Sequence, residues 1–268
     1  MALTSLLEHL DAAREILGQS PAGLFVDVDG TLADIAPTPD EVEVHSAVRD
    51  DLERIAEHLA VSVLTGREVG DARAIVGSDA LLYSGSHGTQ WWQGGRTWVS
   101  PEAEPYAGHV HALAVEAMRQ FSRGDGYIIQ DKGMSMSIHY RLADDASAAR
   151  IAIFKFLAES PDARELSIFQ GKMVAEVRPP VALTKGTALR TIAQELGLAG
   201  AIAIGDDTTD IDMFRAVAEL RRTGAIKGLS VAVLAPEVPT QLLEAADYVL
   251  AGTRGVRRFL GWMAETLD

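Results

Sequence analysis

Two aspartates, Asp27 and Asp29, stand one residue apart at the end of an apolar run that Gly30 interrupts. A run of this kind predicts a buried parallel strand. Residues i and i+2 of a strand point to the same side, so we expect the two carboxylates to face one spot. Burying two acids is costly unless a cation or a reaction uses them. The pair therefore indicates metal-assisted chemistry with a nucleophile and an acid/base.

Three further clusters of polar residues follow other apolar or turn segments. They are Thr65-Gly66-Arg67, Lys185, and Gly205-Asp206-Asp207-Thr208-Thr209-Asp210. Parallel strands gather such clusters at one carboxyl edge of a sheet, where open α/β folds bind ligands. Attack of a carboxylate on a phosphate is opposed by about 4 kcal/mol for each unit charge pair at roughly 4 Å and an effective dielectric near 20. A divalent cation with oxygen ligands, such as Mg²⁺, removes that barrier.

Each feature also has a simpler explanation. Asp29-Gly30 is a common turn pair. The acids from Asp206 to Asp210 can cap a helix. Lys185 can be an ordinary solvated side chain, as most lysines are. Taken together and in this order along the chain, the clusters favour a catalytic site.

Alternating strands and helices are expected to position these residues. Strands are predicted at 24–28, 61–65, 201–205, 230–233 and 248–250, and helices at 3–17, 46–59 and from residue 185. This alternation predicts a parallel sheet with crossover helices.

The pattern changes after about residue 100. Strands are predicted at 127–130, 134–140, 166–169 and 173–177, with helices at 107–122 and 144–160. Clustered strands with one polar face indicate an antiparallel sheet backed by helices. We therefore predict a catalytic core of residues 1–103 and 179–268, with an inserted α/β domain at 104–178.

The composition excludes several classes of protein. The chain has 268 residues, 47% of them hydrophobic, no cysteine and a formal net charge of −14. The acidic balance argues against nucleic acid as a partner. The absence of long apolar runs argues against a membrane span, and the absence of cysteine suits a reducing cytoplasm. We expect a cytoplasmic protein that acts as a monomer on a small molecule.

This set of clusters resembles the motifs of the haloacid-dehalogenase (HAD) superfamily of phosphotransferases. In that superfamily the pattern D-x-D-G-T is followed by a Ser or Thr at the end of the second strand, then by a lysine and by a cluster of acidic residues. The resemblance implies a Rossmann-like parallel-sheet core with an inserted α/β cap of type C2. It also implies that Asp27 is a nucleophile, that Asp29 is a general acid/base, and that Thr65 and Lys185 bind the phosphoryl group. Mg²⁺ would be held by Asp27, Asp29 through its carbonyl, Asp206 and Asp207, with the choice between Asp207 and Asp210 left open.

Further segments resemble trehalose-6-phosphate phosphatases. These are Leu64-Thr65-Gly66-Arg67, Gly85-Ser86-His87-Gly88, Ile138-His139-Tyr140-Arg141 and Lys172-Met173-Val174-Ala175-Glu176-Val177-Arg178-Pro179. The resemblance implies Mg²⁺-dependent hydrolysis of trehalose 6-phosphate in trehalose biosynthesis. Substrate contacts are expected from Gly66, Arg67, His87, Lys172 and Glu176.

Alternatives remain at this point. Lys172 and Glu176 are i and i+4 on a predicted strand, so they share a face and can equally form an ion pair there. The same cap type also serves phosphatases of sucrose phosphate or mannosyl-phosphoglycerate. Two further alternatives that these residues favour less are a phosphomutase and a phosphosugar-binding protein without catalytic activity.

Overall fold

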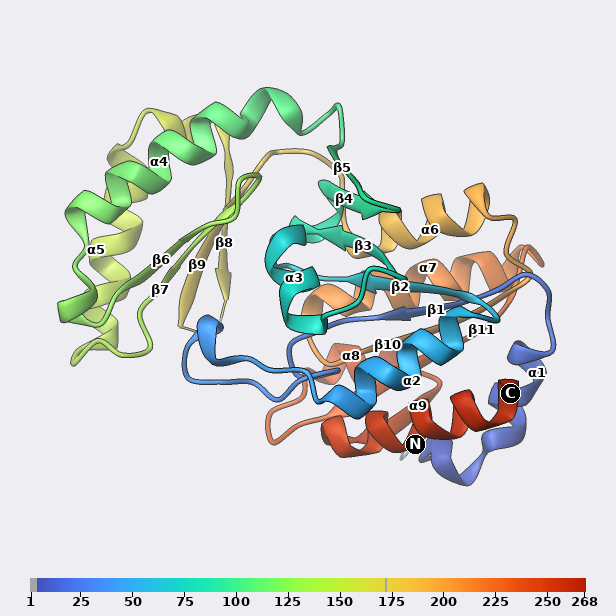
Figure 1. Cartoon of the computed structure of the whole chain (residues 1–268). Helices are drawn as coiled ribbons and strands as arrows, with labels where there is room; N and C mark the ends of the chain where they lie inside the picture. Colours follow the sequence, from blue (N-terminus) through green and yellow to red (C-terminus); the bar gives the residue numbers. More distant parts are fainter. Residues whose placement is uncertain (1–3, 172) are drawn as a thin grey trace. The chain divides into compact units, whose positions relative to one another are not determined.

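The structure is a computed structural model that describes residues 4–171 and 173–268. The internal contacts divide the chain into two compact units. One unit runs up to Trp98 and resumes at Leu183, and the other is Val99–Ala182 (Figure 1). The predicted insert, residues 104–178, lies within the second unit.

An eight-stranded sheet forms the centre of the first unit, in the order β12-β11-β10-β1-β2-β3-β4-β5. Its strands are β1 (Ala22–Val26), β2 (Ala60–Leu64), β3 (Leu82–Gly85), β4 (Gln90–Gln93), β5 (Arg96–Val99), β10 (Gly200–Gly205), β11 (Lys227–Leu234) and β12 (Tyr248–Ala251). All neighbours from β12 to β2 pair in parallel, as predicted. β3, which was not predicted as a strand, pairs in parallel with β2. β4 runs antiparallel to β3, which the sequence did not predict. The short turn between these strands leaves no room for the crossover helix that a parallel connection requires.

Helices cover both faces of this sheet (Figure 1). They are α1 (Leu10–Leu17), α2 (Ser46–Ala56), α3 (Val69–Val76), α6 (Lys185–Glu195), α7 (Ile211–Arg222), α8 (Thr240–Ala245) and α9 (Gly252–Leu267). Alternate strand residues belong to different cores: Leu24 and Val26 pack in one, and Phe25 packs in the other. A sheet buried on both faces explains why its strands are continuously apolar in the sequence.

The helix predicted at 3–17 is shorter in the structure, where α1 begins at Leu10. Within the described part of that range, a 3₁₀ turn at Leu6–Glu8 precedes α1, and His9 between them has non-helical dihedral angles (φ −132°, ψ 44°).

The second unit contains a four-stranded antiparallel sheet in the order β6-β7-β9-β8. Its elements are α4 (Ala107–Gln120), β6 (Ile128–Asp131), β7 (Met136–His139), α5 (Ala146–Glu159), β8 (Ser167–Gly171) and β9 (Val174–Arg178). Ile138 and Val177 on the sheet pack with Val110 and Ile153 on the two helices in a core of their own. Gln130, Ser137 and Glu176 are cross-strand partners on the opposite face, in one row with the exposed Phe169. The antiparallel, helix-backed sheet predicted from the alternating pattern is therefore confirmed.

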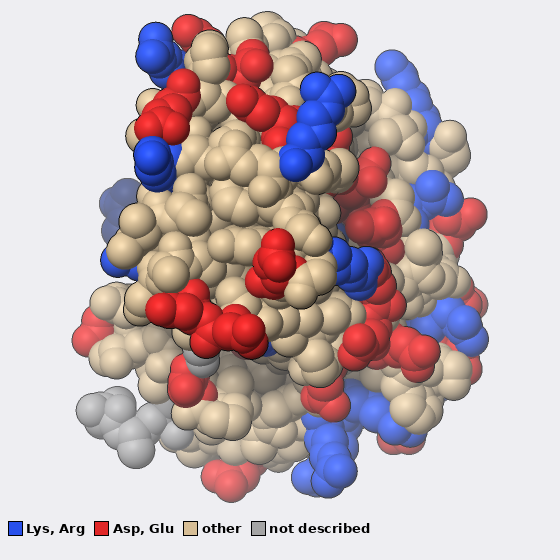
Figure 2. Space-filling view, turned by 90° about the vertical axis from the view of Figure 1, so that its left-hand side faces the viewer, with Lys and Arg blue, Asp and Glu red and all other residues tan. Residues whose placement is uncertain are grey.

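On the face shown in Figure 2, acidic side chains gather in clusters, and basic side chains lie between them without forming a continuous patch. Among residues 4–171 and 173–268, no helix is both long and apolar enough to cross a membrane.

Candidate active site

The four clusters of candidate catalytic residues predicted from the sequence lie at the carboxyl ends of three neighbouring parallel strands. Val26 of β1 is in register with Ile204 of β10 and Val63 of β2, so the three strands end at nearly the same level. The residues that follow are Asp27 after β1, Thr65 after β2 and Asp206 after β10, while Lys185 begins α6. The parallel topology thus brings together residues that are up to about 180 positions apart in the sequence.

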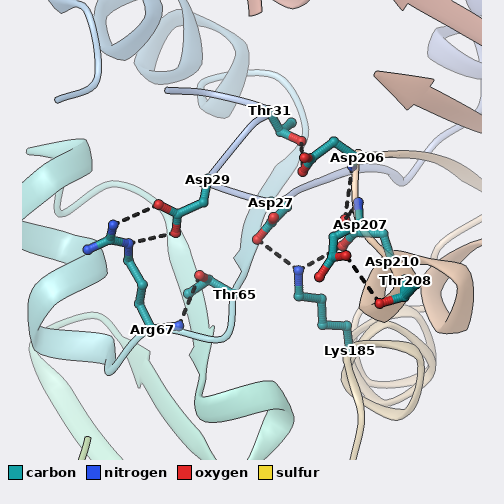
Figure 3. Close-up of polar contacts among 10 residues, drawn as sticks. All are labelled: Asp27, Asp29, Thr31, Thr65, Arg67, Lys185, Asp206, Asp207, Thr208 and Asp210. Carbon is teal, nitrogen blue, oxygen red and sulfur yellow. Dashed lines mark hydrogen bonds and ion pairs between the residues drawn. The ribbon is translucent and has the colours of Figure 1, made fainter. Parts of the chain in front are cut away.

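Lys185 is a buried ammonium between two carboxylates. Its Nζ lies 2.8 Å from Asp27 Oδ1 and 2.7 Å from Asp210 Oδ1, and the three side chains are almost inaccessible (Figure 3). Burial alone would lower the pKa of Lys185, but the charges of Asp210 and Asp27 outweigh burial and raise it. Lys185 therefore stays protonated and holds the Asp27 carboxylate in place.

The pKa of Asp27 is raised well above its usual value. Burial is the main cause; Lys185 opposes it, and the nearby Asp210 and Asp206 add to it. Burial, with Asp210 as the next contribution, also raises the pKa of Asp206 to about 7. One ammonium does not neutralise three buried carboxylates, so the site has an excess of negative charge.

The donor set fits a divalent cation. Carboxylate oxygens of Asp27, Asp206 and Asp210 lie within 4.8 Å of one another, and all three residues are buried. Oxygen donors with excess negative charge are what Mg²⁺ prefers. Both carboxylate oxygens of Asp210 already accept hydrogen bonds. Oδ1 accepts one from Lys185 Nζ, and Oδ2 accepts one from each backbone N–H of Asp206 and Asp207 at 3.0 Å. Asp210 therefore shapes the loop that carries Asp206.

Asp206 is placed by close packing against the turn after β1. Gly30 has φ +81°, and a Cβ at this position would lie 2.1 Å from Asp206 Oδ2. The buried Thr31 hydroxyl donates to Asp206 Oδ1 over 3.4 Å. Glycine at position 30 is thus required by both the backbone conformation and the neighbouring carboxylate.

The side chain of Asp207 is exposed and is hydrogen-bonded to Thr208 at 3.1 Å. Its backbone forms the start of the 3₁₀ turn that leads into α7. Its predicted role as a metal ligand stays a prediction.

Asp29 points to Arg67, whereas Asp27 points to Lys185 (Figure 3). Both oxygens of Asp29 accept hydrogen bonds from Arg67, from Nε and from the NH2 group, each over 2.7 Å. Strand alternation does not orient Asp29, because β1 ends at Val26 and the i, i+2 rule does not apply in the turn beyond it. The charge of Asp29 still adds to the rise in the pKa of Asp27, and the expectation that the two carboxylates serve one spot stays a prediction. Thr65 Oγ1 accepts the backbone N–H of Arg67 over 3.1 Å and lies at the same strand end.

His87 lies against the loop that follows β2. Its backbone N–H donates to the carbonyl of Thr65 over 3.0 Å, and a Cβ on Gly66 would lie 2.6 Å from the His87 ring. Ser86 and His87 both have positive φ, 45° and 58°, which costs on the order of 1–3 kcal/mol for each non-glycine residue. The tertiary contacts hold this turn against the loop, and the predicted substrate contacts of Gly66 and His87 stay predictions.

Within the second unit, the predicted sugar ligand Glu176 lies on β9. Its carboxylate pairs with Arg178 and, at 3.7 Å, with Lys132. Lys172, the other predicted sugar ligand, lies outside the described residues. Sequence reasoning missed Lys132 and Arg178, although Arg178 follows Glu176 at i+2 on the same strand face, a spacing that predicts a neighbouring pair.

The comparisons with known proteins agree with this arrangement. The family model for trehalose-phosphatase matches residues 25–251. A probable trehalose-phosphate phosphatase D from Arabidopsis thaliana is 28% identical over 261 residues, covering 90% of this chain and 67% of the relative. A trehalose-phosphate phosphatase from Mycobacterium bovis is 29% identical over 257 residues, covering 91% and 65%.

Another relative is an uncharacterized glycosyl hydrolase from Mycobacterium tuberculosis, 32% identical over 223 residues, which cover 76% of this chain and 16% of the relative. The chain thus spans about a sixth of that protein and 65% of the M. bovis phosphatase.

Solved structures share the fold. The C-terminal domain of the Candida albicans trehalose-6-phosphate phosphatase superposes with a TM-score of 0.77 at 20% identity, covering 98% of both chains. A HAD subclass IIB sugar phosphatase superposes with a TM-score of 0.55 at 16% identity, covering 92% of this chain and all of the other. The fold is therefore the predicted HAD-type α/β core with an inserted α/β cap domain. With the family model matching most of the chain, the protein belongs to the trehalose-phosphatase family.

Proposed function

We propose that this protein is a Mg²⁺-dependent phosphatase that hydrolyses trehalose 6-phosphate to trehalose and phosphate. The observation that carries the proposal is the buried Lys185, which holds Asp27 at the carboxyl edge of the sheet next to Asp206. A nucleophile held by a charged partner at a ligand-binding edge is suited to covalent catalysis.

In the first half-reaction, a carboxylate oxygen of Asp27 attacks the phosphorus atom. The bond from phosphorus to the sugar oxygen breaks, and that oxygen takes a proton from Asp29. Lys185 holds Asp27 and donates a hydrogen bond to a phosphoryl oxygen, and the Thr65 hydroxyl donates to another phosphoryl oxygen.

In the second half-reaction, water attacks the phosphorus atom of the aspartyl-phosphate. Asp29 accepts the proton of the water, and the bond between phosphorus and Asp27 breaks. Asp27 returns as a carboxylate, phosphate leaves, and Asp29 is protonated for the next cycle.

A magnesium ion, when bound, offsets the repulsion between the carboxylates and the phosphate dianion. Asp27 and Asp206 are the proposed ligands, together with the carbonyl of Asp29 and Asp207. The proximity of the Asp27, Asp206 and Asp210 oxygens supports this assignment.

We propose that the unit Val99–Ala182 is the cap that recognises the sugar. Lys172 and Glu176 would contact its hydroxyl groups, while Gly66, Arg67 and His87 would lie near the phosphate or the sugar. A site built to hydrogen-bond hydroxyl groups rejects ligands that lack them, because its own polar groups stay unpaired.

The first experiment measures phosphate release from trehalose 6-phosphate, sucrose phosphate, mannosyl-phosphoglycerate and other sugar phosphates, with Mg²⁺ and with EDTA. The variants are Asp27→Asn and, as a matched control, Asp11→Asn, whose side chain lies on the exposed side of α1. Selective release from trehalose 6-phosphate that EDTA and Asp27→Asn abolish, and that Asp11→Asn leaves intact, supports the proposal. Selectivity for another sugar phosphate would retain the reaction and reject the substrate, and transfer of phosphate to a second sugar hydroxyl would identify a mutase.

A second experiment tests the role of Glu176. Glu176→Ala should reduce kcat/KM for the disaccharide phosphate by about 10–100-fold more than for p-nitrophenyl phosphate, because only the disaccharide offers hydroxyl groups to the cap. Glu159→Ala, an exposed glutamate of α5, serves as the control. Equal losses on both substrates would contradict a sugar-binding role.

A further inference from the structure

We propose that Arg67 is a positioning residue for Asp29: it fixes the orientation of the carboxyl group that exchanges the proton with the leaving oxygen. This inference rests on the proposed function for the identity of Asp29 as the acid/base. This role differs from the substrate contact predicted for Arg67 from the sequence, which would change KM and not kcat.

The geometry of the pair supports this role. Arg67 donates from Nε to Asp29 Oδ2 and from its NH2 group to Asp29 Oδ1, each over 2.7 Å. Two parallel hydrogen bonds fix the plane of a carboxylate as well as its position, whereas a lysine holds it through a point charge. The residues are 38 positions apart, so no local structure accounts for the pairing.

Arg67 is itself held at several points. Its NH1 group donates to the carbonyl of Pro39 over 3.2 Å, and its backbone N–H donates to Thr65 Oγ1 over 3.1 Å. Its carbonyl accepts the backbone N–H of Ser86 over 2.7 Å. The guanidinium side chain is 10% exposed, whereas that of Asp29 is 37% exposed. The arginine is therefore the rigid partner, and it determines where the more exposed carboxylate lies.

The same pairing separates two carboxylates that are close in sequence. Lys185 holds Asp27, and Arg67 holds Asp29 on the other side of the strand end (Figure 3). Without Arg67, Asp29 would be free to rotate into solvent. A proton donor that is displaced by about 1 Å loses much of its catalytic effect.

The experiment compares Arg67→Lys and Arg67→Gln on substrates with different leaving groups. Hydrolysis of an alkyl phosphate needs a proton for the leaving oxygen, and hydrolysis of p-nitrophenyl phosphate needs it far less. We expect kcat/KM for trehalose 6-phosphate to fall by about 10²-fold with little change in KM, and kcat/KM for p-nitrophenyl phosphate to fall by at least tenfold less. The ratio kcat/KM is compared because it reports the steps up to departure of the leaving group and excludes the water step, in which Asp29 also acts and which both substrates share. Arg67→Lys should also be less active than the wild type on trehalose 6-phosphate, because a lysine cannot form the two parallel hydrogen bonds to Asp29. Arg190→Lys, which breaks an exposed pair with Glu219, is the control for a general effect of losing an arginine.

A double-mutant cycle with Asp29→Asn separates positioning from other roles. If Arg67 acts through Asp29, its substitution should cause no further loss on trehalose 6-phosphate in the Asp29→Asn background. Independent, multiplicative losses would overturn the inference, and so would a rise in KM with an unchanged kcat, which would identify Arg67 as a substrate ligand.

The proposed function and this inference can fail separately. If trehalose 6-phosphate is not a substrate, the comparison of phenyl phosphate with p-nitrophenyl phosphate still measures the dependence on the leaving group. If no phosphate ester is hydrolysed, the proposed function fails, and crystal structures of the wild type and Arg67→Lys decide the inference. An unchanged Asp29 carboxyl orientation in that variant would overturn it.

Discussion

At the scale of single residues, the site depends on how three buried carboxylates and one ammonium share a small volume. Lys185 forms ion pairs with Asp27 and Asp210. Asp206 lies close to both carboxylates, but among the described residues no ion pair joins it to a lysine or arginine. An isolated buried charge is costly, so Asp206 must gain either a proton or a metal ion. Burial, followed by the charge of Asp210, raises the pKa of Asp206 to about 7, so its carboxylate form is favoured only above that pH.

This competition predicts a pH-dependent effect of Mg²⁺. The pKa of Asp206 is about 7 in the folded protein and near the usual value of about 4 when unfolded, so the folded state binds more protons in between. The contribution of this group to stability therefore falls as pH rises from about 4 to about 7. Mg²⁺ binds the carboxylate form, so its stabilising effect should be larger near pH 8 than near pH 6.

Thermal denaturation at both pH values, with Mg²⁺ or with EDTA, measures the effect. At a free ion concentration about 100 times Kd, the stabilisation amounts to about 2.7 kcal/mol. Equal shifts of Tm at both pH values would contradict the prediction, and Asp206→Asn should remove most of the Mg²⁺ response.

Gly30 offers a second residue-scale test. Gly30→Ala should abolish most activity and weaken Mg²⁺ binding, because the new Cβ would meet the Asp206 carboxylate at 2.1 Å. The positive φ alone should cost on the order of 1 kcal/mol. Gly197→Ala is the matched control, since Gly197 also has positive φ (+60°) but nothing within 4 Å of its Cβ position. Similar losses of activity in both variants would show that backbone strain, and not displacement of Asp206, is responsible.

At the scale of elements, the start of α6 determines where Lys185 lies. Thr184 caps the helix, because its hydroxyl accepts the backbone N–H groups of Gly186 and Thr187 at 3.2 Å, and the Thr187 hydroxyl donates to the Thr184 carbonyl over 2.8 Å. The cap fixes the first turn, and Lys185 is the first residue of that turn. A local sequence signal therefore supports a contact between distant parts of the chain.

Removing this cap should affect both stability and turnover. Thr184→Ala is expected to lower the free energy of unfolding by about 1 kcal/mol, measured by urea denaturation, and to reduce kcat because Lys185 loses its fixed position. Asp145→Ala removes the cap of α5, where Asp145 accepts from Ser147 and Ala148, and is the control. If the two variants show equal loss of kcat, the effect is one of general stability.

At the scale of the whole molecule, the two units have separate hydrophobic cores. Buried residues of Val99–Ala182 form a cluster of their own, apart from the two clusters that flank the large sheet. Separate cores permit separate stabilities, since cooperative unfolding follows contiguous packed units.

Matched core substitutions should reveal this independence. Ile153 of α5 and Ile192 of α6 are both almost fully buried, and each substitution by Ala should destabilise its own core by about 2–5 kcal/mol. In hydrogen exchange, Ile153→Ala should lose protection within residues 99–182, whereas Ile192→Ala should lose it in the other unit. Loss of protection across the whole chain from Ile153→Ala would indicate a single cooperative unit.

Local sequence patterns were sufficient to predict the features that repeat along the chain. Apolar runs predicted the strands, the change of pattern near residue 100 predicted a second sheet, and Asp27, Lys185 and Asp206 stood where strands end or a helix begins. These signals depend on periodicity of two or 3.6 residues, so a short segment is enough to contain them. The strand predicted at 24–28 lies at 22–26 in the structure, a shift that periodicity does not resolve.

Which side chains contact one another depends on the tertiary fold. In the structure Asp29 pairs with Arg67, Asp210 pairs with Lys185 and accepts hydrogen bonds from the loop of Asp206, and β4 runs antiparallel to β3. Beyond a strand end the backbone no longer imposes alternation, so each side chain points where packing and charge partners from distant segments place it. Those partners lie 38 and 25 residues away in the two ion pairs, beyond the reach of any local pattern.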